Sequence, residues 1–135
     1  MAYNNRGIAY YELKDYQQAI SDFNQAIKIN SNNAEAYNNR GTVYKNLQNY
    51  TQAIQDFTKA IELNPNLPDT YFYRGVVYIL LNNYEQAIKD FDKAIEINPN
   101  YEKAYFGRGT AYGILGNYST AEIDLAKAKE LGYNF

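Results

Sequence analysis

The feature that most constrains the fold of this chain is a pattern that returns every 34 residues. Four units cover the sequence, over residues 1–33, 34–67, 68–101 and 102–135. Each unit carries an arginine followed directly by a glycine, at Arg6-Gly7, Arg40-Gly41, Arg74-Gly75 and Arg108-Gly109. Because repeats of this length are single supersecondary units that stack on their neighbours, the fold of the chain reduces to the fold of one unit.

Each unit predicts two helices. In the second unit, apolar and small residues recur at spacings of three and four over residues 34–47 and again over residues 51–63, which is the period of a helix face. Gln48-Asn49 separates the two segments, and asparagine suits the left-handed backbone of a tight turn. Asn64-Pro65 ends the second segment, since proline disfavours helical backbone in the residue before it. One such hairpin cannot bury its apolar face alone, so the hairpins are expected to stack.

Composition and charge exclude several classes of function. The net charge of −2 and the pI near 5.1 predict no basic face for nucleic acid and no attraction to anionic membranes. No apolar run approaches the roughly 18 to 20 residues of a membrane span, and no signal-like segment precedes the first unit, which predicts a cytoplasmic protein. The chain has no histidine and no cysteine, and its carboxylates do not converge. The sequence therefore predicts no enzyme, no cofactor and no metal site.

The repeated residues resemble a known family. Tyr-x2-Arg-Gly-x2-Tyr, followed by Ala-x3-Phe, Ala and Pro at a period of 34, is similar to the tetratricopeptide repeat, with Tyr for its usual Trp and Arg for its usual Leu. The resemblance implies an all-α fold: an α-α superhelix, or solenoid, of four helix-turn-helix units and eight antiparallel helices, in one domain over residues 1–135. It also implies that the first helices line a concave groove that commonly binds a peptide or protein segment.

Four arginines and four aspartates recur together. Each arginine of the pattern has an aspartate sixteen residues further on, in the pairs Arg6 and Asp22, Arg40 and Asp56, Arg74 and Asp90, Arg108 and Asp124. A buried arginine needs such a partner, so we interpret them as structural ion pairs between the two helices of a unit. The alternative is a ladder of arginines facing an anionic ligand, against which the matching aspartates argue.

Positions that do not repeat are where recognition is expected. By the resemblance, groove positions of the first two units hold mostly amides, namely Asn4, Asn5, Asn38, Asn39 and Thr42. Asparagine is a poor helix former, so the sequence offers no stability reason for these residues. One hypothesis is an amide ladder that grips the backbone of an extended peptide. The other is that they are solvated polar residues, and the sequence leaves both open.

The last two units are apolar at the same positions. Their first helices carry Phe72, Tyr73, Val76, Ile79 and Phe106 there, and Phe72 and Phe106 are equivalent residues one unit apart. If these side chains face the groove, they form an apolar patch of the kind that marks an interaction surface. The alternative is that some of them belong to the core between units.

The function predicted from these observations is a non-catalytic scaffold that binds a protein or peptide in its groove. Chaperone cofactors of the family hold acidic peptides through a carboxylate clamp of lysine, asparagine and arginine. At the clamp positions of units one to three only Asn39 fits, and with the frame moved one unit only Lys103 fits, so this mechanism is not predicted. The alternatives are a homo-oligomer that stacks end to end, and an engineered repeat scaffold.

Overall fold

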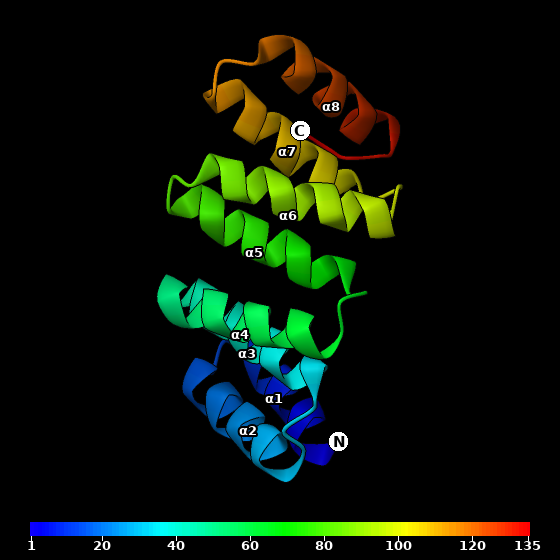
Figure 1. The fold of residues 1–135 in the computed structure, drawn as a ribbon. Coiled ribbons are helices and arrows are strands. Elements are labelled where there is room, and N and C mark those ends of the chain that lie inside the picture. Colours follow the sequence, from blue (N-terminus) through cyan, green and yellow to red (C-terminus); the bar gives the residue numbers. More distant parts are fainter. The chain divides into compact units, whose positions relative to one another are not determined.

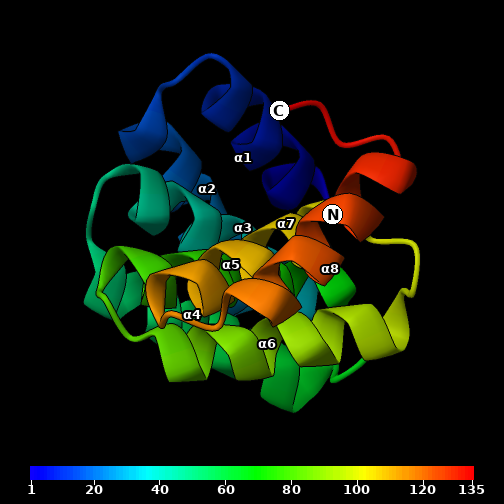
Figure 2. The ribbon, with the colours of Figure 1, turned by 90° about the horizontal axis from the view of Figure 1, so that it is seen from above.

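The computed structural model describes all 135 residues of the chain. They form eight helices joined by short connections, with no strand (Figures 1 and 2). The helices are α1 Ala2–Glu12, α2 Tyr16–Ile29, α3 Ala34–Asn46, α4 Tyr50–Leu63, α5 Pro68–Leu80, α6 Tyr84–Ile97, α7 Glu102–Ile114 and α8 Tyr118–Glu130. Each predicted repeat contains one pair of consecutive helices. The prediction of an all-α fold of four helix-turn-helix units is therefore confirmed.

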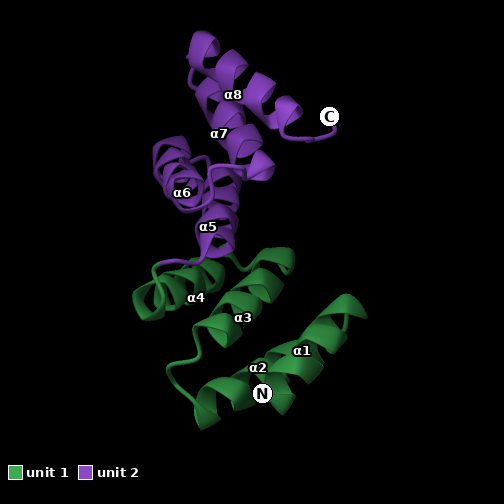
Figure 3. Ribbon diagram, turned by 90° about the vertical axis from the view of Figure 1, so that its right-hand side faces the viewer, with its two compact units in different colours: residues 1–65 green, residues 66–135 purple.

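The helices fall into two compact bodies, each of which holds two of the four repeats (Figure 3). From here on, unit 1 means Met1–Pro65 with α1 to α4, and unit 2 means Asn66–Phe135 with α5 to α8. In each unit both hairpins are formed by consecutive helices. The hairpins are joined in unit 1 by packing of α3 on α2 and α1, and in unit 2 by packing of α7 on α6 and α5. The organisation of residues 1–135 as one domain stays a prediction.

The turn inside each hairpin rests on one residue with left-handed backbone. Lys14, Gln48 and Asn82 have φ of 60° to 61°, and the fourth turn has Gly116 with φ of 85°. At Gln48 the N–H donates to the Lys45 carbonyl (3.0 Å), and the next N–H, that of Asn49, donates to the Tyr44 carbonyl (2.9 Å). This pair of bonds is the Schellman ending of a helix. The Asn49 side chain then accepts from the Gln52 N–H, so one short turn ends the first helix and caps the second.

The core of each of the first three hairpins is built from a phenylalanine against a glycine, and the fourth has Leu125 near Gly109 instead. Phe23, Phe57 and Phe91 are 1%, 0% and 0% exposed. A Cβ at Gly75 would lie only 2.9 Å from the Phe91 ring, and a Cβ at Gly107 only 2.6 Å from it. Two helices of unit 2 therefore approach the same ring at positions where no side chain fits, and the floor of the space between α5 and α7 is this ring.

Candidate functional site

The structure brings all four arginine–aspartate pairs together as two-point ion pairs between the helices of each hairpin. In the second, Arg40 donates from Nε and Nη2 to the two Asp56 carboxylate oxygens at 2.8 and 2.7 Å. The other pairs, Arg6–Asp22, Arg74–Asp90 and Arg108–Asp124, have the same two bonds at 2.7 to 2.9 Å. The four aspartates are 2% to 4% exposed. Each guanidinium is thus engaged by an aspartate of its own hairpin.

The charge state of the Asp22 carboxyl follows from the same bonds. The hydrogen bonds from Arg6 hold the pKa of Asp22 below its ordinary value, although burial acts in the opposite direction. The Asp22 carboxylate is therefore ionised at neutral pH, and its pair with Arg6 is a true ion pair. Arg40 and Arg108 use their remaining Nη1 groups on Asn24 and Asp92, each at 2.8 Å. These contacts give no support to an arginine ladder that faces a ligand.

In unit 1 one of the predicted groove amides, Asn4, is buried and bonds to another, Asn39. Asn4 is 1% exposed, donates from Nδ2 to the Glu35 carboxylate (3.1 Å) and accepts at Oδ1 from Asn39 Nδ2 (3.2 Å). It thereby joins α1 to α3, and its amide is not available to a peptide. The hydroxyl of Thr42 donates to the Asn38 carbonyl of its own helix (3.0 Å), and Asn5 is exposed. The bond between Asn4 and Asn39 joins α1 to α3, and the gripping of a peptide by the other amides stays a prediction.

Asn4→Ala should therefore destabilise the protein by about 2 kcal/mol, because it leaves buried polar partners without their bonds. The neighbouring Asn5→Ala removes an exposed amide and should stay within about 0.5 kcal/mol of the wild type. Urea unfolding followed by circular dichroism measures both losses. Equal stability of the two variants would show that the Asn4 bonds contribute nothing.

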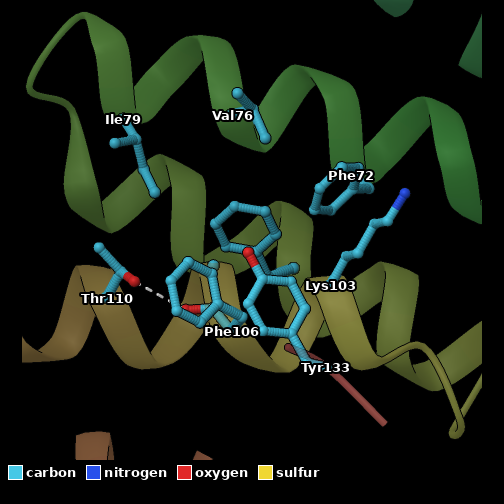
Figure 4. Close-up of a pocket in the computed structure, with 9 residues that line it drawn as sticks. Phe72, Val76, Ile79, Lys103, Phe106, Thr110 and Tyr133 are labelled. Carbon is cyan, nitrogen blue, oxygen red and sulfur yellow. Dashed lines mark hydrogen bonds between the residues drawn. The ribbon is translucent and has the colours of Figure 1, made fainter. Parts of the chain in front are cut away.

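In unit 2 the equivalent place is an apolar cavity of about 330 Å³, here called the α5/α7 cleft (Figure 4). Three residues of α5 and four of α7 line it, together with Phe91 of α6 and one residue beyond α8. These are Phe72, Val76, Ile79, Phe91, Lys103, Phe106, Gly107, Thr110 and Tyr133. The Thr110 hydroxyl donates to the Phe106 carbonyl (2.8 Å), so it brings no free donor into the cleft. Lys103 is exposed and is the one charged residue of the lining.

Phe72 is held in the wall of the cleft by other aromatic rings. Its ring centroid lies 5.8 Å from that of Phe91, 5.2 Å from that of Tyr101 and 5.5 Å from that of Tyr73. The Tyr101 hydroxyl donates to the Asp69 carboxylate of α5. Burial, with this bond, raises the pKa of the Tyr101 phenol, which therefore stays protonated and keeps α5 bonded to the start of α7.

The repeats identify the family of the chain. Residues 1–33, 34–67 and 68–101 each match the sequence profile of the tetratricopeptide repeat, and residues 91–123 match a second profile of the same repeat. The chain belongs to the tetratricopeptide repeat family. It is thus a helical repeat scaffold, a class of fold that presents extended surfaces to other molecules.

Solved structures of other tetratricopeptide proteins are similar to this chain. A crystal structure of MamA is 28% identical with a TM-score of 0.90, over 96% of this chain and 75% of that one. MamA 41-end from Desulfovibrio magneticus RS-1 is 25% identical with a TM-score of 0.87, over 96% and 73%. The first tetratricopeptide domain of Spaghetti (RPAP3), bound to the HSP90 peptide SRMEEVD, is 24% identical with a TM-score of 0.83, over 85% and 91%. No curated protein matches the sequence.

Two repeat positions that bound the cleft in unit 2 hold different residues in unit 1. Counting by the 34-residue period, Asn4 corresponds to Phe72, and Asn39 corresponds to Gly107. In unit 1 the Asn39 side chain bonds to Asn4, whereas at Gly107 a Cβ would lie only 2.6 Å from the Phe91 ring. The Phe91 ring therefore lies directly against α7 at Gly107 and forms the floor of the cleft there.

The structure brings four of the five predicted apolar residues together. Phe72, Val76, Ile79 and Phe106 line the cleft, whereas Tyr73 contacts Phe72 from outside the lining. Sequence analysis missed Tyr133, whose path depends on how α8 ends. The signal was present as Gly132, a typical helix-ending glycine, followed by aromatic residues.

The remaining predictions concern membranes, self-association and location. None of the eight helices combines the length and the apolar character that crossing a bilayer demands. On α8, the side chains of Tyr118 and Ile123 are each 69% exposed. Assembly of copies end to end stays a prediction, as does the cytoplasmic location.

Proposed function

We propose that the chain is a non-catalytic scaffold that binds a segment of another protein in the α5/α7 cleft. The observation that carries the proposal is the apolar cavity of about 330 Å³ between two first helices of consecutive repeats. Its volume lies at the lower end of the range of roughly 300 to 1,000 Å³ for ligand pockets, which suits one or two side chains of a bound segment. The related fold bound to the HSP90 peptide shows that tetratricopeptide helices present a segment-binding surface in another protein.

The lining indicates which kind of segment fits. Val76, Ile79 and Phe106 supply apolar contact, and the Thr110 hydroxyl is already bonded to its own helix. The energy of binding then comes from burial of apolar side chains of the partner. Lys103 adds a positive charge at the edge, which favours an acidic residue of the segment by a small amount because the pair is exposed to solvent.

The proposal predicts that peptides selected from a displayed random library bind the wild-type chain and lose at least about tenfold in affinity on Val76→Glu, because that change buries a carboxylate in the cleft. Thr42→Glu is the matched control, since Thr42 holds the same position one 34-residue repeat earlier and does not line the cleft. Fluorescence anisotropy of a labelled, selected peptide measures the affinities, and circular dichroism verifies the fold of each variant.

Two results would contradict the proposal. The first is a library that yields no peptide with affinity for the wild-type chain. The second is a set of peptides that bind Val76→Glu as well as they bind Thr42→Glu, which would place the binding surface outside the cleft.

A further inference from the structure

The end of α8 differs from the ends of α2, α4 and α6. Those three helices end on an asparagine with extended backbone, at Asn30, Asn64 and Asn98. After α8 the backbone of Gly132 is left-handed, with φ of 103°. The Gly132 N–H donates to the Lys129 carbonyl (3.0 Å) and the Tyr133 N–H to the Ala128 carbonyl (2.9 Å). This is the same Schellman turn that reverses the chain inside each hairpin.

The turn directs residues 133–135, here called the tail, onto α7. The Tyr133 ring stacks on the Phe106 ring, with centroids 4.3 Å apart and an interplanar angle of 15°. Phe135 lies edge-on to both rings, at 5.4 Å from each. Figure 4 shows Tyr133 beside Phe106 with its side chain directed into the space between α5 and α7. The tail therefore places the Tyr133 ring in the lining of the cleft, and Phe135 packs against the Phe106 and Tyr133 rings beside it.

From this contact, and resting on the proposed function, we propose that the α5/α7 cleft recognises a partner segment with two aromatic side chains separated by one residue, and that the tail occupies this site until the partner displaces it. Tyr133 and Phe135 show the geometry that the site accepts, with one ring flat on Phe106 and a second ring edge-on. Flat stacking of this kind favours an aromatic ring over an aliphatic side chain of the same area.

Occupation by the tail lowers the apparent affinity for a partner. A partner binds only the fraction of molecules in which the tail has left Phe106, so its apparent dissociation constant rises as that fraction falls. The tail competes as part of the same molecule, at an effective concentration of the order of millimolar. We expect removal of the two tail rings to raise the affinity about tenfold, equivalent to about 1.4 kcal/mol.

The test uses the full chain with Tyr133→Ala and Phe135→Ala, and a heptapeptide probe that copies residues 129–135, Lys-Glu-Leu-Gly-Tyr-Asn-Phe. The double variant should bind the probe about tenfold more tightly than the wild type does. Shifts of the Val76 and Thr110 amides in an NMR titration place the probe in the cleft. A probe with leucine in place of tyrosine and phenylalanine should lose most of the affinity. Asn134→Ala, between the two rings and exposed, is the matched control and should behave as the wild type.

Equal affinity of the probe for the wild type and the double variant would overturn the inference. A leucine probe that binds as tightly as the aromatic probe would overturn it as well. Gly132→Ala provides an independent variant, because it keeps both rings but strains the left-handed turn that places them. It should raise the affinity as well. If library peptides bind the cleft while the aromatic probe does not, the inference fails and the proposed function stands. If neither binds, the proposed function fails as well.

Discussion

Asp56→Ala is expected to lower the free energy of unfolding by about 3 kcal/mol, the range seen when one partner of a buried ion pair is removed. Asp56 is 3% exposed and accepts two hydrogen bonds from Arg40, whose side chain is 19% exposed. Without the carboxylate, the guanidinium stays enclosed and loses its two strongest bonds, and its remaining bond to Asn24 does not neutralise its charge. Urea unfolding followed by circular dichroism measures the loss.

Asp22→Ala is the matched comparison. Its pair with Arg6 has the same two bonds, both at 2.8 Å, but the Arg6 side chain is 59% exposed. Water hydrates the released Arg6 guanidinium, so the loss should be clearly smaller than that of Asp56→Ala. Equal losses would show that burial of the arginine does not decide the effect. An unchanged stability of Asp56→Ala would show that these pairs do not stabilise the hairpins.

The sequence predicts the fold of this protein well because the determinants of each hairpin are local and are repeated four times. A turn such as Gln48-Asn49 combines the left-handed residue that ends one helix with the residue that caps the next. The glycine of each first helix marks the close approach of the second helix, as Gly75 does for Phe91. Such features depend on neighbours within one 34-residue repeat, so they can be recognised from a single sequence.

The site is less predictable because its contacts depend on residues one repeat apart and on the path of the tail. The apolar face of α5 and α7 was predicted from the recurrence of Phe72 at Phe106. The bonds of Asn4 to Glu35 and Asn39 were not predicted, since they join residues 31 and 35 positions apart. The position of Tyr133 depends on a single turn at Gly132, which the repeat pattern does not describe because α2, α4 and α6 end on an asparagine with extended backbone instead.

Phe91→Ala is expected to lower the free energy of unfolding by about 4 kcal/mol, within the range for loss of a buried phenylalanine side chain. Phe91 is fully buried and forms the floor of the α5/α7 cleft. Gly75 and Gly107 face its ring, and neither has a side chain that moves into the vacated space. The loss is measured by urea unfolding, and an unchanged stability would mean that the ring is not part of the core.

A double-mutant cycle with Gly107→Ala identifies the cause. In the wild type this substitution places a Cβ 2.6 Å from the Phe91 ring and should cost about 1 to 3 kcal/mol through overpacking. In the Phe91→Ala background the same methyl group enters empty space, so the cost should disappear and the two losses should not add. Gly113→Ala is the control, because its Cβ would meet only Ala121, at 3.8 Å, and its effect should be the same in both backgrounds. Additive losses for Gly107→Ala and Phe91→Ala would show that ring and glycine do not share one space, and the account of Gly107 as the position that lets the Phe91 ring lie against α7 would fail.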